Sequence, residues 1–431
     1  MVRILLNCLD TLGKSMAGPA IRYWEFAHAL AKSHQVTLRV PNQTDQVSTN
    51  FTISTGPIQF KKIDVIITQT IDPNLALHAK RHKIPLIYDA YDPEPLEHLE
   101  IFKPSALKVR KHLNRAIIHT INFNLRMADA VICANHRQRD LWIGALLSLR
   151  KISPSIYDQD ETLHKLVGIA PFGIPSRPAI QSNSGFREKF NIKASDKLLL
   201  WGGGIWNWFD PLTLIRAVKE LSKQRSDIKL VFMGIRHPNA SIPIMSMANK
   251  AIKLAEDLKI KDQFVFFNEQ WIPYEERENF LLDADIGVST HFEHLETQYS
   301  FRTRLLDYIW AGLPLITTEG DVFAELVLKN KIGKVVPAQD IQALVLAISQ
   351  LIDNSAETLR IKSKLKELRE QLVWEKAVVP LEEIIEHLMN NPLKNYFAYD
   401  LAKIFYYQLQ KCHPWNLIER WWVRRNNGIK T

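Results

Sequence analysis

The sequence predicts an α/β protein made of two Rossmann-like doubly wound domains that face one another across a cleft. The chain has 431 residues, enough for two domains that each bury a core of their own. Short apolar runs rich in β-branched residues alternate along it with amphipathic stretches of helical period. A segment dense in proline and glycine, residues 169–178, divides this alternation into two halves and predicts a hinge.

These patterns predict an N-terminal domain over residues 1–175 and a second domain over residues 186–375. Residues 376–431 are expected to form helices that pack back on the first domain. Doubly wound sheets bind their ligands beyond the carboxyl ends of the strands. A binding site is therefore expected in the cleft, built from the loops that follow the strands.

The first domain opens with a strand, a glycine-containing loop, an amphipathic helix and a strand, at residues 3–9, 10–20, 21–34 and 36–40. This order places Gly13 and Gly18 at the N-terminus of a helix that faces the cleft. Their spacing differs from the G-x-G-x-x-G pattern of dinucleotide sites. Arg22 lies in the first turn of that helix, where it either meets an anion or has an exposed structural role.

Three more apolar strands are expected in this domain, followed by a helix, at residues 64–70, 84–92, 128–135 and 136–149. Asp89, Asp92 and Glu94 follow the apolar part of the second of these strands. Carboxylates at the carboxyl end of a strand face the crevice in this architecture. Capping of the next helix is the alternative role for these acids.

The second domain opens with a strand at residues 198–201 and three consecutive glycines. The glycines have no β-carbons, so backbone N–H groups there can come close to a ligand. The helix after them begins at Asp210 and Pro211, which suit the N-cap and first helical positions. Trp206 and Trp208 lie in between and either pack in the core or stack on a sugar. The alternation continues through residues 228–238, 263–273, 286–290, 313–318, 321–331, 332–336, 340–352 and 357–372.

The segment 285–321 contains the strongest indication of a ligand. A strand, a polar loop without helical or strand period, a helix and a second strand follow one another there. The helix begins close to Ser300 or Thr303, either of which suits the N-cap. Arg302 and Arg304 then lie at or inside its first turn, where each cation opposes the helix dipole by about 0.3–1 kcal/mol. A bound anion reverses that sign, because free N–H groups and arginine forks both suit phosphate oxygens.

Asp307 lies about one turn further along the same helix, where its carboxylate could accept two hydroxyls of a ribose. The alternative is a surface pair between Arg304 and Asp307, worth about 0.2–0.5 kcal/mol at helical spacing. Glu293, Glu296 and His291 crowd the preceding loop. We therefore favour an anion site at this helix.

The run SFRTRLLDYIWAGLPLIT, residues 300–317, resembles the nucleotide-sugar-binding segment of the family 4 glycosyltransferases, which are retaining enzymes of the GT-B fold. The family pattern has a glutamate, seven residues, a second glutamate and a helix that runs into an A-G-x-P turn. Here AGLP occupies residues 311–314, and Asp307 stands at the position of the second glutamate. Tyr299 takes the place of the first glutamate, and Glu296 is the nearest acid.

The family also has an arginine and, five residues on, a lysine after the first strand of the second domain, and both neutralise the donor diphosphate. Aligned with this pattern, the chain has Gly204 and Phe209 at the two positions. We therefore expect Arg302 and Arg304 to supply the positive charge. The resemblance implies a donor site on the second domain made of Gly203, Gly204, Trp206, Asn207, Arg236, Trp271, Phe301, Arg302, Thr303, Arg304 and Asp307.

The resemblance also implies catalytic and acceptor-side residues. Glu296 is a catalytic candidate because of its place near the missing glutamate, and Asp89 because many relatives carry a histidine near that point. Gly18 and Arg22 correspond to the first-domain loop that approaches the acceptor or the donor phosphate. A metal is not required on this interpretation, since no Asp-x-Asp pair lies in the expected second-domain cleft. No cofactor is expected besides the nucleotide-diphosphate sugar that serves as the donor.

The charge and composition of the chain limit the kinds of partner and compartment that we expect for the protein. The net charge of +9 and the pI near 9.2 suit phosphate-bearing substrates or an anionic membrane surface, and the charge is too diffuse to indicate nucleic acid. The 3 cysteines, Cys8, Cys133 and Cys412, lack metal-ligand spacing and predict thiols in a reducing compartment. No signal peptide and no apolar run of membrane-spanning length is evident. We expect a cytoplasmic protein.

The last forty or so residues, 391–431, differ in character from the rest, with basic and aromatic side chains at helical spacing. Packing of these helices on the first domain accounts for much of their apolar content. The alternative is attachment to an anionic membrane, with Trp421, Trp422, Arg424 and Arg425 at the headgroup level. A peripheral position on the inner face of a membrane is consistent with that alternative.

The expected function is a retaining hexosyltransferase that moves a sugar from a nucleotide-diphosphate sugar to a glycan or lipid-linked acceptor, in surface polysaccharide or glycolipid synthesis. The alternative is a catalytically inactive nucleotide-sugar-binding protein docked on a membrane. A nicotinamide-dependent oxidoreductase would need the dinucleotide fingerprint that this chain lacks. A nucleic-acid-binding protein would need its basic residues gathered on one face.

Overall fold

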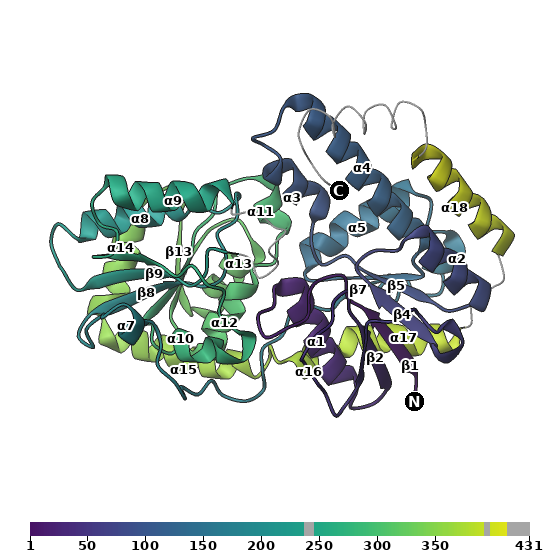
Figure 1. Cartoon of the computed structure of the whole chain (residues 1–431), viewed down its shortest axis with the longest axis horizontal. Helices are drawn as coiled ribbons and strands as arrows, with labels where there is room; N and C mark the ends of the chain where they lie inside the picture. Colours follow the sequence, from purple (N-terminus) through teal and green to yellow (C-terminus); the bar gives the residue numbers. More distant parts are fainter. Residues whose placement is uncertain (237–244, 392–396, 412–431) are drawn as a thin grey trace.

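The computed structural model describes residues 1–236, 245–391 and 397–411, and it contains two α/β domains that lie side by side (Figure 1). Each domain has a central sheet in which every pair of neighbouring strands is parallel. The predicted fold class, two Rossmann-like doubly wound domains, is confirmed.

Within the described ranges, the first sheet has seven strands in the order β3-β2-β1-β4-β5-β6-β7. Helices cover both faces, and β4, β5 and β6 are therefore buried and apolar along most of their length. The strands are β1 (Arg3–Asn7), β2 (Gln35–Arg39), β3 (Thr52–Ser54), β4 (Val65–Thr68), β5 (Leu86–Asp89), β6 (Ala130–Cys133) and β7 (Val167–Ile169). The helices are α1 (Gly18–Leu30), α2 (Pro73–His82), α3 (Glu94–Ile101), α4 (Leu107–Met127), α5 (His136–Ser148) and α6 (Pro154–Tyr157), with a 3₁₀ turn at Phe60–Lys62.

The second sheet has, among the described residues, six strands in the order β10-β9-β8-β11-β12-β13. The strands are β8 (Lys197–Trp201), β9 (Ile228–Phe232), β10 (Val265–Phe267), β11 (Ile286–Ser289), β12 (Leu315–Thr318) and β13 (Gly333–Val336). The helices are α7 (Phe186–Lys189), α8 (Pro211–Leu221), α9 (Ser246–Asp257), α10 (Arg277–Leu281), α11 (Leu295–Tyr299), α12 (Thr303–Ala311), α13 (Val322–Asn330), α14 (Ile341–Asp353) and α15 (Ser355–Arg369), with a 3₁₀ turn at Tyr274–Glu276.

The strand order reverses between β1 and β4 in the first sheet and between β8 and β11 in the second. Loops that leave neighbouring strands at such a point run in opposite directions and open a crevice between them. In the second domain these loops are residues 202–210 and 290–302. The topology therefore brings the three glycines and the start of α12 to the same edge of the sheet.

The chain crosses between the domains twice, and the two crossings are bonded to each other. The Ile174 N–H donates to the Leu372 carbonyl at 2.9 Å, and the Trp374 N–H donates to the Ile174 carbonyl at 3.1 Å. After the second crossing the chain forms α16 (Trp374–Ala377), α17 (Val379–Asn390) and α18 (Phe397–Lys411). Helix α17 packs on β7 and α18 packs on α2, both in the first domain (Figure 1).

The segment before α12 differs from its sequence-based description. Residues 295–299 form the short helix α11, although the loop shows no helical period in the sequence. Helix α12 begins at Thr303 with Arg302 at the N-cap position and has no side-chain cap. Ser300 does not cap it, because its hydroxyl donates to the Thr297 carbonyl at 3.1 Å instead. The strands β3 and β7 were also missed, since both have only three residues.

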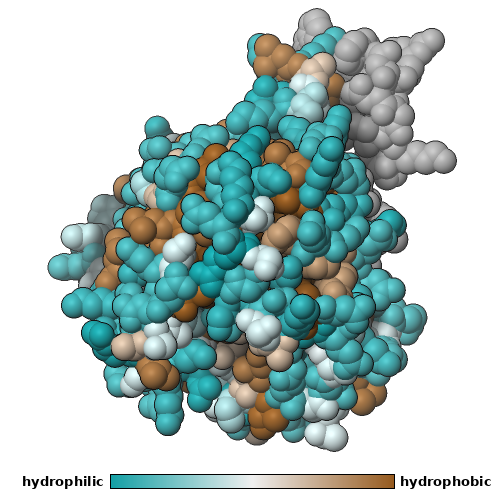
Figure 2. Space-filling view, turned by 90° about the vertical axis from the view of Figure 1, so that its left-hand side faces the viewer, coloured by the Kyte–Doolittle hydropathy of each residue, from teal (hydrophilic) through white to brown (hydrophobic). Residues whose placement is uncertain are grey.

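The end of the second domain that points away from the first shows mostly hydrophilic side chains with hydrophobic residues between them (Figure 2). Exposed apolar residues scattered in this way are ordinary for a protein surface. In the part of the chain that the structure describes, no helix combines the length and the apolar character needed to cross a bilayer. Trp421, Trp422, Arg424 and Arg425, the candidates for membrane contact, lie outside the described residues.

Candidate active site

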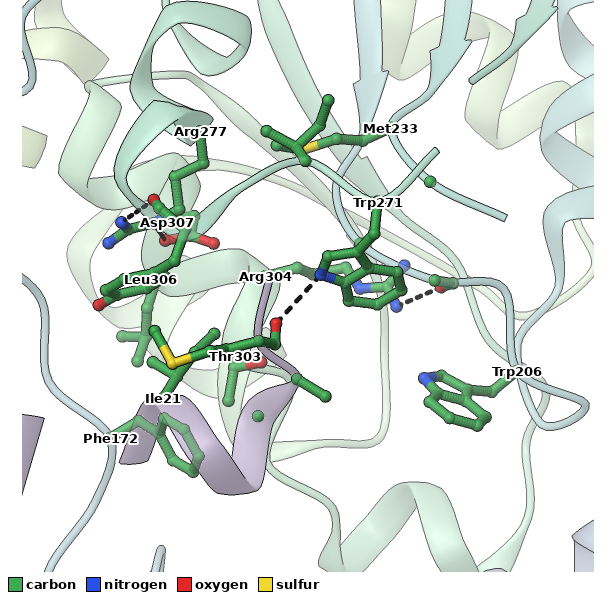
Figure 3. Close-up of a pocket in the computed structure, with 18 of the residues that line it drawn as sticks. Ile21, Phe172, Trp206, Met233, Trp271, Arg277, Thr303, Arg304, Leu306 and Asp307 are labelled. Carbon is green, nitrogen blue, oxygen red and sulfur yellow. Dashed lines mark hydrogen bonds and ion pairs between the residues drawn. The ribbon is translucent and has the colours of Figure 1, made fainter. Parts of the chain in front are cut away.

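A pocket opens between the two domains at the carboxyl ends of their strands (Figure 3). The first domain contributes the loop after β1, the start of α1 and the segment before the linker, and the second contributes the loops after β8, β9 and β10 and the first turns of α12. The lining residues are Met16, Ala17, Gly18, Ile21, Phe172, Gly173, Gly203, Gly204, Trp206, Met233, Gly234, Trp271, Ile272, Tyr274, Arg277, Thr303, Arg304, Leu306, Asp307 and Trp374. Of the residues proposed from the sequence, those that line this pocket are Gly18, Gly203, Gly204, Trp206, Trp271, Thr303, Arg304 and Asp307.

The glycine turn after β8 is held in place by Tyr308 of α12. The Tyr308 hydroxyl accepts a hydrogen bond from the Gly202 N–H at 2.6 Å and donates to the Leu200 carbonyl at 2.9 Å. The ring has room because residue 287 is a glycine, where a β-carbon would lie 2.3 Å from a ring atom of Tyr308. Gly203 has a φ of +71°, in the left-handed region that glycine adopts without strain. The backbone of this turn therefore has a fixed orientation at the pocket wall.

Replacing Tyr308 by phenylalanine is expected to lower the free energy of unfolding by about 1–3 kcal/mol, because the buried Gly202 N–H loses its acceptor. The glycine turn should also become looser, and binding of a ligand in the pocket should weaken. Chemical denaturation measures the first effect and calorimetric titration the second. Tyr157→Phe, which changes a half-exposed tyrosine on α6, is the control. Equal unfolding free energies for Tyr308→Phe and the wild type would contradict this role.

Arg304 is a buried cation that lines the pocket. Its guanidinium carbon lies 4.1 Å from the centroid of the Phe209 ring and 4.8 Å from that of Trp201. One terminal nitrogen donates to the Gly204 carbonyl at 2.8 Å, and the other has no hydrogen-bond partner. No carboxylate among the described residues forms an ion pair with it. Burial, together with the nearby charge of Arg302, lowers the pKa of Arg304 to about 9.

Asp307 lies one turn beyond Arg304 and pairs with Arg277 instead. The Arg277 Nε lies 3.1 Å from Asp307 Oδ1, and the Asp307 side chain keeps 37% of its surface exposed. The surface pair between Arg304 and Asp307, which the sequence left open as an alternative, is therefore not formed. Arg277 was missed by the sequence analysis because it precedes Asp307 by thirty residues, and only the packing of α10 against α12 brings the two together.

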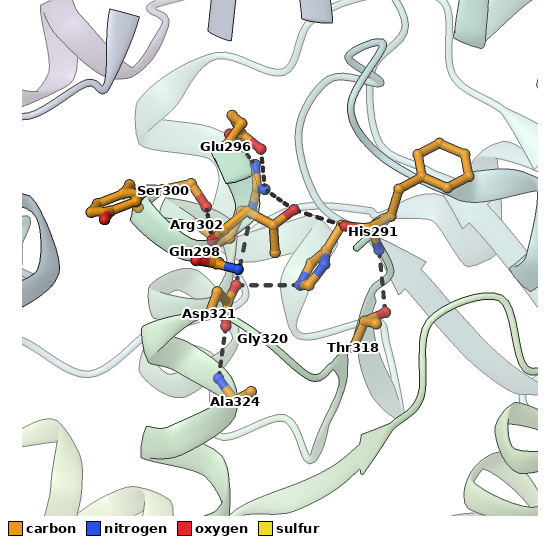
Figure 4. Close-up of polar contacts among 12 residues, drawn as sticks. His291, Glu296, Gln298, Ser300, Arg302, Thr318, Gly320, Asp321 and Ala324 are labelled. Atoms are coloured by element: carbon orange, nitrogen blue, oxygen red, sulfur yellow. Dashed lines mark hydrogen bonds and ion pairs between the residues drawn. The ribbon is translucent and has the colours of Figure 1, made fainter. Parts of the chain in front are cut away.

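Arg302 and Glu296 form an ion pair buried in the second domain (Figure 4). The two terminal nitrogens of Arg302 lie 3.1 Å and 2.8 Å from the carboxylate oxygens of Glu296, and the side chains are 4% and 1% exposed. Neither residue lines the pocket. This corrects the placement of Arg302 in the donor site and of Glu296 as a catalytic residue. The reason is α11, which turns Glu296 toward Arg302 so that each charge neutralises the other.

The same network includes His291 and Asp321, both fully buried (Figure 4). The His291 Nε2 lies 3.4 Å from Asp321 Oδ2, and Asp321 Oδ1 accepts from the Ala324 N–H at 2.8 Å to cap α13. Burial alone would raise the pKa of Asp321, but its contact with His291 and the charge of Arg302 outweigh burial and lower this pKa. The network of Arg302, Glu296, His291 and Asp321 thus stabilises the loop between β11 and α12 from inside the domain.

Arg22 and Asp89 also neutralise each other. The Arg22 Nε donates to Asp89 Oδ2 at 2.8 Å, and one Arg22 terminal nitrogen donates both to Asp89 Oδ1 at 2.9 Å and to the Ala170 carbonyl at 2.8 Å. Both side chains are 0% exposed. This corrects the assignment of Asp89 as a catalytic residue and of Arg22 to the acceptor loop. Both were expected to face the cleft, but the rings of Phe26, Tyr91 and Phe172 cover the Arg22 guanidinium, and the pair is closed to solvent.

Three more residues proposed for the donor site lie elsewhere. Asn207 accepts hydrogen bonds from the Met247 N–H and the Ser246 hydroxyl, both at 3.1 Å, and so stabilises the start of α9. Arg236 is exposed and pairs with Glu269 at 3.2 Å. Phe301 packs among aromatic rings instead of lining the pocket. Within the described ranges, no three His, Cys, Asp or Glu side chains converge in a way that could hold a metal ion.

Comparison with known proteins supports the assignment of the fold. Residues 184–368 match the family model of the group 1 glycosyl transferases. No curated protein sequence matches the chain. Sucrose-phosphate synthase from Thermosynechococcus elongatus superposes with a TM-score of 0.64 at 16% identity, over 90% of this chain and 100% of that one.

Two further solved structures resemble the whole chain. WaaG, a glycosyltransferase involved in lipopolysaccharide biosynthesis, has a TM-score of 0.60 at 16% identity, over 89% of this chain and 98% of that one. HepE from Anabaena, in complex with UDP-glucose, has a TM-score of 0.60 at 14% identity, over 90% of this chain and 100% of that one. The second domain of this chain thus matches the group 1 glycosyl transferase model, and the two domains together have the fold of these solved structures, the GT-B fold.

Proposed function

We propose that this protein is a glycosyltransferase whose donor, a nucleoside-diphosphate sugar, binds in the pocket between the domains. The observation that supports this most strongly is Arg304, a buried guanidinium at the pocket wall with no described carboxylate as its ion-pair partner. A buried charge without a counter-charge costs free energy, and a bound anion offsets that cost. The match of the second domain to the group 1 family and the UDP-glucose complex of HepE point to the same ligand class.

The diphosphate is expected to lie against Arg304, the N-terminus of α12 and the backbone of Gly203 and Gly204. Arg304 contacts Gly204 and Phe209, the positions at which the family 4 pattern has an arginine and a lysine. One arginine from α12 therefore places its charge where those two residues would lie. The oxygen of Asp307 that does not bond to Arg277 remains for the ribose hydroxyls, and the base then lies toward the loops after β9 and β10.

The proposed reaction breaks the bond between the anomeric carbon of the sugar and the diphosphate, and forms a bond from that carbon to an acceptor oxygen, whose proton is released. The nucleoside diphosphate departs with one additional negative charge. A positive charge that is already oriented and shielded from water stabilises this negative charge as it develops on the leaving group. The resemblance to family 4 favours transfer of a hexose with retention of anomeric configuration. The acceptor would enter along the first-domain wall formed by Met16, Gly18 and Ile21.

Thermal-shift measurement with UDP, GDP and ADP, and with the glucose and mannose derivatives of each, tests this proposal. A ligand present at 100 times its dissociation constant stabilises the folded protein by about 2.7 kcal/mol. We expect one base to give a clear rise in melting temperature, and slow release of the same nucleotide from its sugar. If none of these compounds raises the melting temperature, the proposed donor site is wrong.

Nucleotide binding is expected to weaken as the pH rises through about 9, because the pKa of Arg304 is lowered to about 9. Below that pH the guanidinium is protonated and attracts the diphosphate, and above it the attraction is lost. Titration calorimetry between pH 7 and pH 10 measures the change. The Arg304→Lys variant, which keeps a charge but loses the planar fork, provides a comparison. Constant affinity across this range in the wild type would contradict the lowered pKa, and an affinity of Arg304→Lys equal to that of the wild type would contradict the assigned contact.

We further propose that the acceptor is a glycan or a lipid-linked sugar, as in the synthesis of surface polysaccharide or glycolipid. The likeness to WaaG supports this suggestion. Attachment to an anionic membrane on its cytoplasmic side stays a prediction, since the residues proposed for it lie beyond residue 411. Co-sedimentation of the full chain with anionic and with neutral vesicles tests it, and equal recovery with the two kinds of vesicle would contradict it.

A second candidate is a nucleotide-sugar-binding protein without catalysis. One observation favours it: of the described residues that line the pocket, Asp307 is the only carboxylate, and it already pairs with Arg277. Asp89 and Glu296 are held in buried ion pairs. Release of nucleotide from a bound nucleotide sugar by the purified protein separates the two candidates, because a binding protein would leave the donor intact.

A further inference from the structure

Arg277 is a buried cation held between two aromatic rings. Its guanidinium carbon lies 3.7 Å from the centroid of the Tyr274 ring and 4.5 Å from that of Trp310. It donates to the Tyr274 carbonyl at 2.7 Å and to Asp307 Oδ1 at 3.1 Å. Stacking on the rings and two hydrogen bonds fix the plane of the guanidinium. The orientation of the Asp307 carboxylate is therefore fixed with it.

The segment that carries Arg277 also crosses to the first domain. The Tyr274 hydroxyl donates to the Glu25 carboxylate of α1 at 2.7 Å, and the Tyr274 N–H donates to the Lys14 carbonyl at 2.9 Å. The Trp271 indole N–H donates to the Met16 carbonyl at 3.0 Å, across the pocket (Figure 3). The segment 271–277 thus contacts the pocket on one side and the first domain on the other.

Glu25 and Asp307 lie in different domains, and the charge of Arg277 attracts both carboxylates. Tyr274 connects them physically, because its ring covers Arg277 while its hydroxyl reaches Glu25. A ribose hydroxyl that donates to Asp307 bonds to the same carboxylate that pairs with Arg277. The contacts therefore form one continuous unit: Asp307, Arg277, Tyr274 and Glu25.

We propose that Arg277 is a positioning residue that orients Asp307 toward the donor, and that the Tyr274–Glu25 contact couples occupation of the donor site to the association of the two domains. This proposal depends on the proposed donor function. Binding free energy is transmitted between two sites when both bias the same element, and here that element is the segment 271–277. Because this segment is bonded both to the pocket and to the first domain, a shift caused by ligand on one side is expected to change the contacts on the other.

The variants Arg277→Gln, Tyr274→Phe, Glu25→Gln and the double variant Tyr274→Phe/Glu25→Gln test the two parts of the proposal. Tyr274→Phe removes one oxygen and keeps the ring over Arg277, so it should fold even if Arg277→Gln does not. Arg177→Gln is the matched control. Arg177 also stacks on Trp310, at 5.2 Å, but its partner is Glu278 and it does not contact Asp307.

The first readout is the dissociation constant of UDP, GDP and ADP. Arg277→Gln should raise this dissociation constant at least about tenfold, because the Asp307 carboxylate loses the partner that orients it toward the donor. Arg177→Gln should leave it unchanged. In a double-mutant cycle, Tyr274→Phe and Glu25→Gln should be non-additive, with the double variant no weaker than either single one. Wild-type affinity in folded Arg277→Gln, or additive effects in the cycle, would overturn the proposal.

The second readout is hydrogen exchange in α1 at residues 24–28, which lie outside the pocket lining. Nucleotide should slow exchange there in the wild type and in Arg177→Gln, and should have no such effect in Tyr274→Phe or Glu25→Gln although both still bind it. The same protection in all four proteins overturns the coupling.

This second readout also separates the two proposals. If none of the three nucleotides binds the wild type, the proposed donor function fails and the orienting role of Arg277 fails with it. In that case the rate of hydrogen exchange at residues 14–18 and 24–28, measured without ligand, still tests whether Tyr274 holds the two domains together. Exchange should be faster in Tyr274→Phe than in the wild type. Equal rates overturn the contact.

Discussion

Replacing Arg304 by methionine is expected to stabilise the ligand-free protein and to abolish most of its nucleotide binding. Methionine has a similar length and can rest on the rings of Phe209 and Trp201 that the guanidinium now covers. Removing a buried charge without a counter-charge should raise the free energy of unfolding by about 1 kcal/mol or more. Losing a charge-assisted contact to the diphosphate should weaken binding by about 1.5–3 kcal/mol, which is tenfold or more.

Urea denaturation and titration with UDP, GDP and ADP measure these two opposite effects. Arg216→Met is the control, because it removes the same charge from an exposed position on α8. The control should leave both the unfolding free energy and the nucleotide affinity near the wild-type values. Affinity within twofold of the wild type in Arg304→Met would show that Arg304 does not bind the donor.

Replacing Arg302 by methionine should have the opposite effect on stability. It leaves the Glu296 carboxylate buried without its partner, and breaking a buried ion pair in this way costs about 3–5 kcal/mol. That is a large part of the about 5–15 kcal/mol by which a domain is stable. Much of the Arg302→Met protein should therefore be unfolded or aggregated at 37 °C, as measured by circular dichroism and by the soluble fraction.

The double variant Arg302→Met/Glu296→Gln separates a structural role from a role in binding. With both charges of the pair removed, stability should return to within about 1–2 kcal/mol of the wild type, because Glu296 no longer leaves a buried charge and Asp321 keeps its contacts with His291 and the Ala324 N–H. Its nucleotide affinity should be close to that of the wild type, since neither residue lines the pocket. A stable Arg302→Met protein, or a stable double variant that no longer binds nucleotide, would contradict the assignment of this pair to the interior.

Variants at the two arginines therefore distinguish a charge that faces a ligand from one that is neutralised inside the fold. The two residues are two positions apart and chemically identical. The same change to methionine should shift stability in opposite directions, because a carboxylate pairs with Arg302 and no described carboxylate pairs with Arg304. The buried pair also helps to hold the loop between β11 and α12 in its position.

The architecture was largely predictable from local patterns. Buried strands such as β11 and β12 are short apolar runs, and helices such as α12 have an amphipathic period with a glycine at the end. These signals come from neighbouring residues and depend little on the rest of the chain. Among the elements that were not predicted, β3, β7 and α11 have only three to five residues, too few for a period to show. The longer helices α2, α4 and α9 were not assigned from the sequence either.

The candidate site was predictable where its residues lie in the two loops at the strand reversal. Gly203, Gly204, Thr303, Arg304 and Asp307 all line the pocket, because the carboxyl ends of parallel strands meet at one edge. Sequence position alone could place these segments together. It could not show that Arg277 is the partner of Asp307, because the two lie on different helices whose contact depends on packing.

The sequence by itself determined two doubly wound domains, a cleft between them and a basic helix start beside a glycine turn. Only the tertiary structure decided which charges remain available to a ligand. Arg22, Asp89, Glu296 and Arg302 all carry the chemistry of a binding site, and all four are neutralised by partners that are buried with them. Whether a charge is paired depends on distances of a few ångströms between segments far apart in the chain, which residue type and spacing do not specify.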